Sequence, residues 1–149
     1  MTKEEILDNI KKYLGNKILQ WQEKSPKRYY IEVAPVDIPE TTRYIFRELG
    51  ARFQIATAVD TPSAIEVLYH WAFDANHFVV TVKTKLDRQN PEVESVAWIC
   101  PGTEWIEREM WELMGINFKH HPDLRHLLLV DNWPEGQYPL RRDFKGINQ

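Results

Sequence analysis

Residues 53–84, FQIATAVDTPSAIEVLYHWAFDANHFVVTVKT, decide the fold of this chain. Apolar and polar residues alternate along three stretches of this segment, and a period of two is typical of half-buried strands. The pieces between these stretches are short enough to be hairpin turns. The segment therefore predicts three consecutive antiparallel strands. The expected strands are residues 53–59, 65–71 and 78–84, joined by turns at residues 60–63 and 74–77.

Two helices are expected before this segment, and capping residues mark where each begins. Thr2 and Glu5 have the spacing of a capping box, and Gly15 is suited to the end of the helix that follows. Asp37 and Glu40 have the same spacing before a second apolar stripe of helical period. The two helices are expected at residues 2–14 and 38–49.

A strand is expected at residues 29–33, where apolar and polar residues alternate, and a shorter one at residues 18–21. The order is therefore β-α-β-β-β. This order predicts an α+β fold, in which helices pack on a mostly antiparallel sheet of about four strands.

The residues after the strands are expected to be irregular apart from one helix. Val96–Ile99 is expected to be a short extended piece. Thr103 is suited to cap a helix that runs to Met114 and ends at Gly115. On this helix Arg108 lies four residues from Glu104 and from Glu112, the spacing of helical ion pairs.

The last segment is unusual because it is irregular and yet rich in apolar residues. Disordered extensions are usually polar and poor in aromatic residues, whereas this one contains Trp133, Tyr138 and Phe144. Two interpretations stay open: the segment folds back on its own domain, or it lies across another subunit. We expect an α+β domain at residues 1–115 and an extended C-terminal arm at residues 116–149.

Composition excludes several classes of function. The net charge is −3 and no basic block stands out, which argues against nucleic-acid binding. No run reaches the roughly 20 apolar residues of a membrane span, and the N-terminus has no apolar signal core, so a cytoplasmic location is expected. Cys100 is the single cysteine. One thiol cannot hold an ordinary iron–sulfur cluster, which takes about four protein ligands.

Few side chains are candidates for catalysis or metal binding. Cys100 is expected to be a core residue, since no His or Lys lies nearby in the sequence to activate its thiol. The densest set of potential metal ligands matches no standard zinc spacing. The carboxylates of the helix at residues 103–114 are expected to form a charged face that packs against the arginines of the arm. The set of potential ligands comprises His120, His121, Asp123 and His126.

Residues 107–144, EREMWELMGINFKHHPDLRHLLLVDNWPEGQYPLRRDF, resemble the signature region of the family of the 30 kDa subunit of complex I. The family pattern begins with ERE, continues through an acid, an apolar pair, a His and an Arg, and later has the element GxxPLR[KR]DF. In this chain the matching or neighbouring signature residues are Glu107, Arg108, Glu109, Glu112, His121, Asp123, Arg125, Asp131, Trp133, Arg141, Arg142, Asp143 and Phe144.

The resemblance implies a scaffold subunit without a cofactor of its own, so no chemistry is expected in this chain itself. Such a subunit packs, in the hydrophilic arm of a membrane-bound electron-transfer and ion-pumping complex, against a large catalytic subunit and a small 4Fe-4S subunit. Iron–sulfur clusters, and a quinone or nickel–iron site, are expected in those partners. The C-terminal arm is expected to wrap over them, and the chain to be peripheral to the cytoplasmic side of the membrane.

Two departures from the family pattern leave the type of complex open. The acidic position after the ERE motif is Glu112, where Asp is commoner in quinone-linked members. Gln137–Tyr138 stand where a shorter sequence often occurs in the family. With the short chain, these departures favour a hydrogenase-type or other ferredoxin-linked complex over an NADH-quinone oxidoreductase. Two other classes of function remain as alternatives: a small soluble enzyme that uses Glu109, Glu112 and His121, and a free-standing adaptor.

Overall fold

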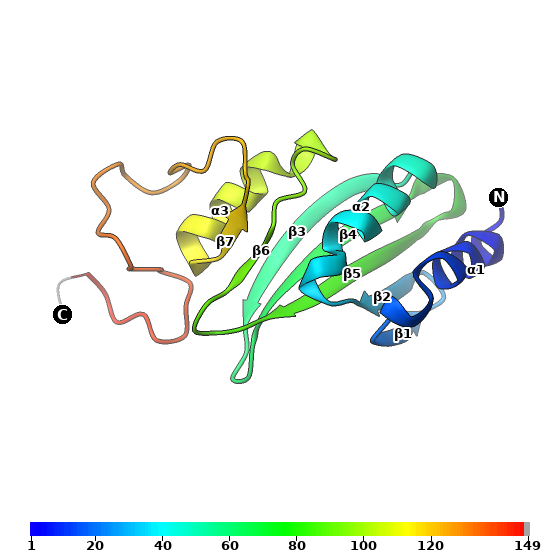
Figure 1. Ribbon diagram of the computed structural model, residues 1–149, viewed down its shortest axis with the longest axis horizontal. Coiled ribbons are helices and arrows are strands. Elements are labelled where there is room, and N and C mark those ends of the chain that lie inside the picture. Colours follow the sequence, from blue (N-terminus) through cyan, green and yellow to red (C-terminus); the bar gives the residue numbers. More distant parts are fainter. Residues whose placement is uncertain (148–149) are drawn as a thin grey trace.

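A computed structural model describes residues 1–147, which form three α-helices, a five-stranded sheet and a two-stranded sheet. Figure 1 shows the helices packed against the large sheet, with the N-terminus and the C-terminal arm at opposite ends. The large sheet contains β1 (Gln20–Ser25), β2 (Arg28–Glu32), β3 (Arg52–Asp60), β4 (Ile65–Phe73) and β5 (Phe78–Leu86), in the order β1-β2-β5-β4-β3. The helices are α1 (Lys3–Leu14), α2 (Ile38–Arg43) and α3 (Glu104–Met114), and the small sheet pairs β6 (Glu92–Glu94) with β7 (Asn117–Lys119).

The predicted α+β class is confirmed, and so is the hairpin order of residues 53–84. β3 pairs with β4 and β4 with β5, each antiparallel. β2 and β5 are the one parallel pair of the large sheet. The crossover through α2 places β3 on the far side of β4, and the chain then returns through β4 to β5, which lies next to β2. The first strand lies at Gln20–Ser25, later than the expected residues 18–21.

The period-two pattern of β4 places the core between the large sheet and the helices. Val67, Tyr69 and Trp71 are buried, whereas the intervening Leu68 and His70 are partly exposed. Burying apolar surface stabilises the fold by roughly 25 cal/mol per Å². The buried face continues into the helices, with Ile6, Ile10 and Leu14 of α1, Ile45 after α2, and Met110 and Met114 of α3.

One of the expected capping arrangements forms and two do not. Thr2 and Glu5 make the reciprocal hydrogen bonds of a capping box. The expectation for Asp37 was wrong, because a 3₁₀ turn at Pro35–Asp37 precedes α2 and puts Asp37 in a helical conformation rather than an extended one. Thr103 makes no cap either, since its hydroxyl donates back to the Cys100 carbonyl.

The connection between β5 and α3 also differs from the prediction. Val96–Ile99 was expected to be extended, but the backbone amide of Cys100 bonds to the carbonyl of Val96 at 2.8 Å, which makes this piece a turn. The extended piece lies earlier, at β6, where it pairs in parallel with β7. That pairing joins two segments far apart in the chain, and short-range patterns carry no signal for it.

The first residues of the C-terminal arm belong structurally to the core. Ile116 and Phe118 are buried with the apolar residues of the body, residues 1–115. From His120 onward the arm contains no helix or strand within the described residues. The arm as a separate functional unit stays a prediction, and its last two residues, 148–149, lie outside the described part of the chain. No helix in residues 1–147 is long and apolar enough to cross a membrane.

Candidate interface on α3 and the C-terminal arm

Four charged residues of the signature region lie on α3, and all but Glu109 are buried. Glu107 is fully inaccessible, and Arg108 and Glu112 are nearly so. α3 ends at Gly115, whose backbone is left-handed (φ 75°), a conformation that glycine adopts without the penalty of a Cβ. Charged side chains are almost never fully buried unless they are paired. Their partners therefore define what α3 holds in place.

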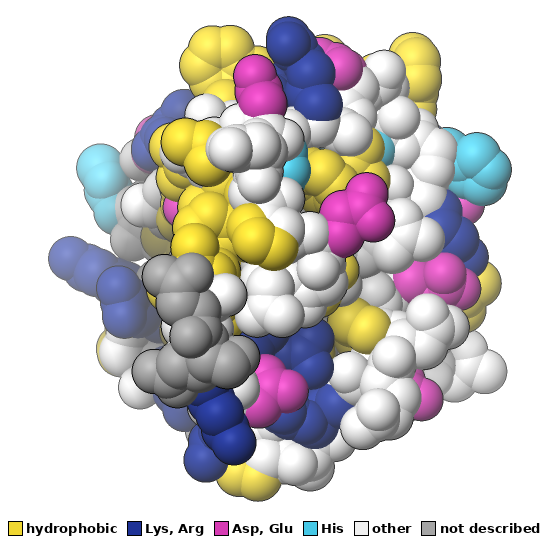
Figure 2. Space-filling view, turned by 90° about the vertical axis from the view of Figure 1, so that its left-hand side faces the viewer, with side chains coloured by type: hydrophobic (Ala, Val, Ile, Leu, Met, Phe, Trp, Pro, Cys, Tyr) yellow, Lys and Arg dark blue, Asp and Glu magenta, His cyan; other side chains and the backbone are white. Residues whose placement is uncertain are grey.

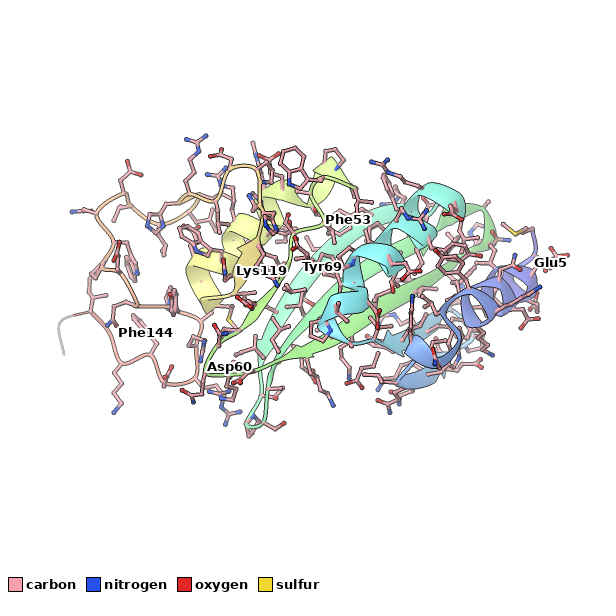
Figure 3. The ribbon with its side chains drawn as sticks, in the orientation of Figure 1. Glu5, Phe53, Asp60, Tyr69, Lys119 and Phe144 are labelled. Carbon is pink, nitrogen blue, oxygen red and sulfur yellow. The ribbon has the colours of Figure 1, made fainter. Side chains whose placement is uncertain are left out.

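Glu107 faces the large sheet and joins it to the turn after β6. Its carboxylate accepts hydrogen bonds from the Tyr69 hydroxyl at 2.9 Å, the Ser95 hydroxyl at 2.6 Å and the Val96 amide at 3.1 Å. Burial raises the pKa of Glu107 to about 7, although these hydrogen bonds act to lower it. Figure 3 shows Tyr69 in the middle of the molecule, on the strand that lies under this contact.

Glu112 holds the C-terminal arm through main-chain amides. Its carboxylate accepts hydrogen bonds from the backbone N–H groups of Leu127 at 3.0 Å, Leu128 at 2.6 Å and Leu129 at 3.3 Å, and Nδ1 of His126 lies 3.0 Å away. Burial acts to raise the pKa of Glu112, but the hydrogen bonds from Leu128, Leu127 and His126 outweigh it and lower the pKa below 4.5.

Arg108 completes this contact from the neighbouring turn of α3. Its guanidinium donates hydrogen bonds to the carbonyl of Arg125 at 2.9 Å and to that of His126 at 2.6 Å. The ion pairs expected within the helix, Glu104 with Arg108 and Arg108 with Glu112, do not form. Backbone groups of the arm bind both side chains instead. We call the contact of Arg108 and Glu112 with residues 125–129 the α3 clasp.

A second contact joins the end of the arm to the tip of β3, and Asp60 is its centre. The Asp60 carboxylate pairs with Arg88, accepts the backbone N–H of Arg142 at 2.8 Å and lies 3.4 Å from Nε of Arg141. Arg141 also donates to the carbonyls of Met114 and Arg88, each at 3.2 Å. Figure 3 shows Asp60 at the corner of the sheet that the returning arm approaches. We call this contact the Asp60 clasp.

Aromatic side chains of the arm lie between the two clasps. The Tyr138 ring packs against Gly115 so closely that a Cβ on Gly115 would lie 2.6 Å from it. Trp133 donates its indole N–H to the carbonyl of Gln137 at 2.7 Å, and its ring lies 6.4 Å from that of Phe144. The arm is therefore shaped by its own contacts as well as by α3.

Several apolar side chains are exposed on the outer side of the arm. Leu128, Val130 and Leu140 are each about three-fifths exposed. Figure 2 looks onto this end of the molecule and shows hydrophobic side chains gathered in its upper left part, beside basic ones. Trp98 and Trp105 add exposed aromatic surface near the start of α3, and each is 66% exposed. Exposed patches of this kind mark interaction sites in soluble proteins.

The remaining signature residues lie along the surface of the arm. Asp123 pairs with Arg125 at 2.8 Å, and His121 lies 2.9 Å from the carbonyl of Glu104. Asp131, Arg142 and Asp143 are exposed. Four residues that take part in the clasps or bind Glu107 were missed by sequence reasoning, because each lies far along the chain from its partner. These four are Asp60, Tyr69, Arg88 and Ser95.

The residues of the alternative enzyme site do not meet. Glu109 borders a hollow between β3 and α3, Glu112 borders a hollow under residues 133–138, and His121 borders a third beside β7. The histidines of the densest ligand set also have separate neighbours, since His120 faces Glu94 and His126 faces Glu112. In residues 1–147, no three His, Cys, Asp or Glu side chains are arranged to hold a metal ion. Cys100 is buried in the core, and burial raises the pKa of its thiol.

Comparison with known protein sequences gives related proteins over most of the chain. Residues 31–149 match the family described as respiratory-chain NADH dehydrogenase, 30 Kd subunit. The chain is 41% identical over 93 residues to a subunit of the F(420)H(2) dehydrogenase of Methanosarcina mazei, covering 61% of this chain and 58% of that protein. It is 42% identical over 91 residues to a subunit of the NADH-quinone oxidoreductase of Moorella thermoacetica, covering 60% of each. The chain thus spans about three-fifths of the length of these two relatives.

Solved structures share the fold. A chain of the membrane-bound sulfane sulfur reductase, an archaeal respiratory membrane complex, superimposes with a TM-score of 0.84 at 25% identity, covering 97% of this chain and 86% of that one. The trypsin-resistant fragment of Nqo5 superimposes with a TM-score of 0.66 at 18% identity, covering 83% of this chain and all of that one. The second likeness concerns the fold alone.

Proposed function

The chain belongs to the family of the 30 kDa subunit of respiratory-chain NADH dehydrogenase, and from this membership we propose that it is a non-catalytic scaffold subunit of a complex I-related membrane complex. In this proposal it lies in the hydrophilic arm, on the cytoplasmic side of the membrane. It packs there against a large catalytic subunit and a small 4Fe-4S subunit. The iron–sulfur clusters, and a quinone or nickel–iron site, belong to those partners.

The C-terminal arm supplies the observation that carries the proposal. Buried Arg108 and Glu112 bind the main chain of residues 125–129, so this contact does not cover the side chain of Leu128 or that of the adjacent Val130. Leu128 and Val130 are accordingly exposed. A preformed apolar surface loses little conformational entropy on binding, which favours association. The two interpretations of the arm are thus compatible, because its main chain binds this chain while its apolar side chains stay free to contact a partner.

The two arginines of the arm take different roles in this proposal. Arg141 is an internal contact, since its guanidinium bonds to main-chain carbonyls of the body. The Arg142 side chain is exposed and has no hydrogen-bond or ion-pair partner within residues 1–147. We assign Arg142 to a carboxylate on the partner. An Arg-to-Lys change keeps the charge but removes the planar fork that binds carboxylates in two places.

The proposal is tested by purifying the native complex through a tag on this chain. Leu128→Glu and Val130→Glu should lower the yield of co-purified large and small subunits, because each places a charge in an apolar contact. Val36→Glu is the control, since Val36 is 81% exposed but lies beside α2, away from the arm. Arg142→Lys should lower the yield, while activity per assembled complex stays normal in every variant. Normal yield with lost turnover would instead place chemistry in this chain.

The division of the chain into body and arm is tested by truncation. Ile116 and Phe118 are buried in the core, so the informative cut follows Lys119 rather than Gly115. Residues 1–119 should give a folded α+β protein by circular dichroism that no longer captures the partner subunits. An unfolded product would show that the arm is needed to complete the core. A folded product that still captures both subunits would remove the arm from the interface.

A further inference from the structure

The large sheet has one free edge that is long and carries no charged residue between its two ends. β3 is its last strand and pairs only with β4. Within the described residues, no backbone hydrogen bond joins residues 52–60 to a segment other than β4. The outward N–H and C=O groups of this strand therefore have water as their partner in the isolated chain. Such an edge is a ready template for pairing with another chain.

The two edges of the sheet differ in how they are protected against pairing with another chain. β1, the opposite edge, carries Glu23 and Lys24 in its middle, and charged residues are a usual protection of a free edge. Residues 53–59 of β3, FQIATAV, contain no charged residue. Ile55 and Val59 are each 45% exposed there. A bulge between Phe53 and Ile55 protects only the first part of the strand. An edge of this kind is expected to be covered in the assembled protein.

An apolar groove lies beside this edge. The groove has a volume of about 190 Å³, several times the roughly 30 Å³ that a water molecule occupies in the liquid. The small side chains of Ala56 and Ala58 leave this space open below α3. A strand added to β3 would turn every second side chain toward it. The other lining residues are Thr57, Ile106, Glu109, Met110, Leu113, Met114 and Leu140.

Glu109 makes the groove suited to an occupant that carries a positive charge. It is the one ionisable residue of the lining, it is partly buried, and its carboxylate has no hydrogen-bond or ion-pair partner within residues 1–147. A partly buried carboxylate favours an opposite charge close by. An occupant with a Lys or Arg between apolar residues would pair with Glu109 and place its apolar side chains in the groove.

We propose that the free edge of β3 and the groove beside it bind an extended segment of a neighbouring subunit as an added strand, with alternate apolar side chains in the groove and a basic residue facing Glu109. The inference rests on the scaffold role proposed above and adds a contact surface on the body of the chain. The free backbone groups of β3 decide for a strand over a helix, because only an extended partner pairs with them. α3 lies beside this edge in Figure 1 and forms the other wall of the site.

Amide hydrogen exchange of the wild-type chain, alone and in the purified native complex, tests the pairing directly. Amides of β3 that bond to β4 are protected in both states. The alternate, outward amides should exchange roughly tenfold or more slowly in the complex. Residue-level mass spectrometry detects this period-two pattern. Protection of no β3 amide on assembly would overturn the inference, and so would uniform protection without alternation.

A matched pair of variants tests the groove. Ala58→Lys places a long charged side chain in the groove, whereas Val36→Lys places it at an exposed site beside α2, away from β3 and from the arm. Glu109→Lys should repel the basic residue, and Glu104→Lys on the same helix is its control. Ala58→Lys and Glu109→Lys should lower complex yield several-fold more than their controls, with unchanged melting temperatures of the isolated chains. Equal yields in each pair would overturn the inference while the arm variants still test the scaffold role. A wild-type chain that co-purifies with no other subunit would overturn both.

Discussion

Glu107 and Glu112 are both buried glutamates of α3, and yet their surroundings shift the pKa values of their carboxyl groups in opposite directions. Burial raises the pKa of Glu107 to about 7. Burial acts on Glu112 too, but main-chain N–H groups outweigh it and lower the pKa. Glu107 faces the sheet and is bound mostly by hydroxyl groups, which can reorient around a neutral carboxyl. Glu112 faces the arm, where fixed backbone donors require the anion.

α3 therefore joins two parts of the molecule by different chemistry. The contact with the sheet is part of the core and tolerates an uncharged side chain. The contact with the arm is a charge-assisted one, which is about twice as strong per hydrogen bond as a neutral one. The arm can therefore be held firmly although few of its apolar residues are buried. Changes that remove charge should separate the two contacts.

The largest effect is expected for Glu112→Gln. The amide group of Gln would put a donor against the N–H groups of Leu127–Leu129, so several charge-assisted bonds of about 1.5–3 kcal/mol are weakened together. The free energy that holds the arm should fall by roughly 4 kcal/mol, less than the sum because water solvates the released amides. Hydrogen exchange of residues 125–129 measures this. Glu109→Gln, the same change on the same helix, should leave their exchange unaltered. Equal exchange in the two variants would contradict the α3 clasp.

The next effect is a pH dependence that Glu107 imposes on stability. The folded protein keeps a proton on Glu107 up to about pH 7, whereas the unfolded chain releases it near the ordinary pKa of 4.5. The unfolded chain thus binds fewer protons between these values, and the free energy of unfolding falls as pH rises from 4.5 to 7. This rise of about 2.5 in the pKa of Glu107 corresponds to about 3 kcal/mol. Urea unfolding at several pH values checks this.

Glu107→Gln should remove this slope, because Gln resembles the protonated side chain at every pH. The variant should then be at least as stable as the wild type at about pH 8, above the folded pKa of Glu107. Glu112 contributes the opposite way: its pKa is lowered on folding, so its stabilisation is present above pH 4.5 and is lost as pH falls through the folded pKa. A wild-type slope that persists in Glu107→Gln would assign it to other groups.

A smaller effect is expected for Asp60→Asn at the Asp60 clasp. The neutral amide of Asn cannot form an ion pair with Arg88 or Arg141, and these two partly buried arginines then lack their counterion. The side chains of both arginines also bond to main-chain carbonyls, which limits the loss to roughly 2 kcal/mol. Faster exchange at residues 138–144, with residues 125–129 unchanged, would show that the two clasps hold the arm independently. Release of both segments together would show one cooperative unit.

The smallest effect is expected for Gly115→Ala. An alanine in the left-handed region costs about 1 kcal/mol, and its Cβ would also displace the Tyr138 ring. Gly50→Ala is the matched control, because Gly50 has a similar φ of 72° with nothing within 4 Å of an added Cβ. The difference between the two melting temperatures isolates the contact of Tyr138 with the helix end. Equal losses would mean that Tyr138 moves aside freely.

Local patterns in the sequence were enough to predict the α+β class, the hairpins of residues 53–84, the capping box of Thr2 and Glu5, and the family. Alternation and capping depend on neighbours within a few residues, so they can be recognised without the fold. The caps predicted at Asp37 and Thr103 failed for the same reason, because Pro35–Asp37 and Cys100 supply competing turns just outside those patterns.

The apolar composition of the arm was evident in the sequence, whereas its attachment was not. Charged spacing on α3 predicted ion pairs along the helix, but in the folded chain Arg108 and Glu112 bind main-chain groups of residues 125–129. Glu107 likewise binds a distant strand, through Tyr69. Every backbone carries the same N–H and C=O groups, so no residue type indicates which of them a charge will meet. Sequence patterns alone thus specify the elements and the family. Which charges are buried, and what they hold, follows from the folded arrangement, because burial and pairing depend on segments that are distant in the chain.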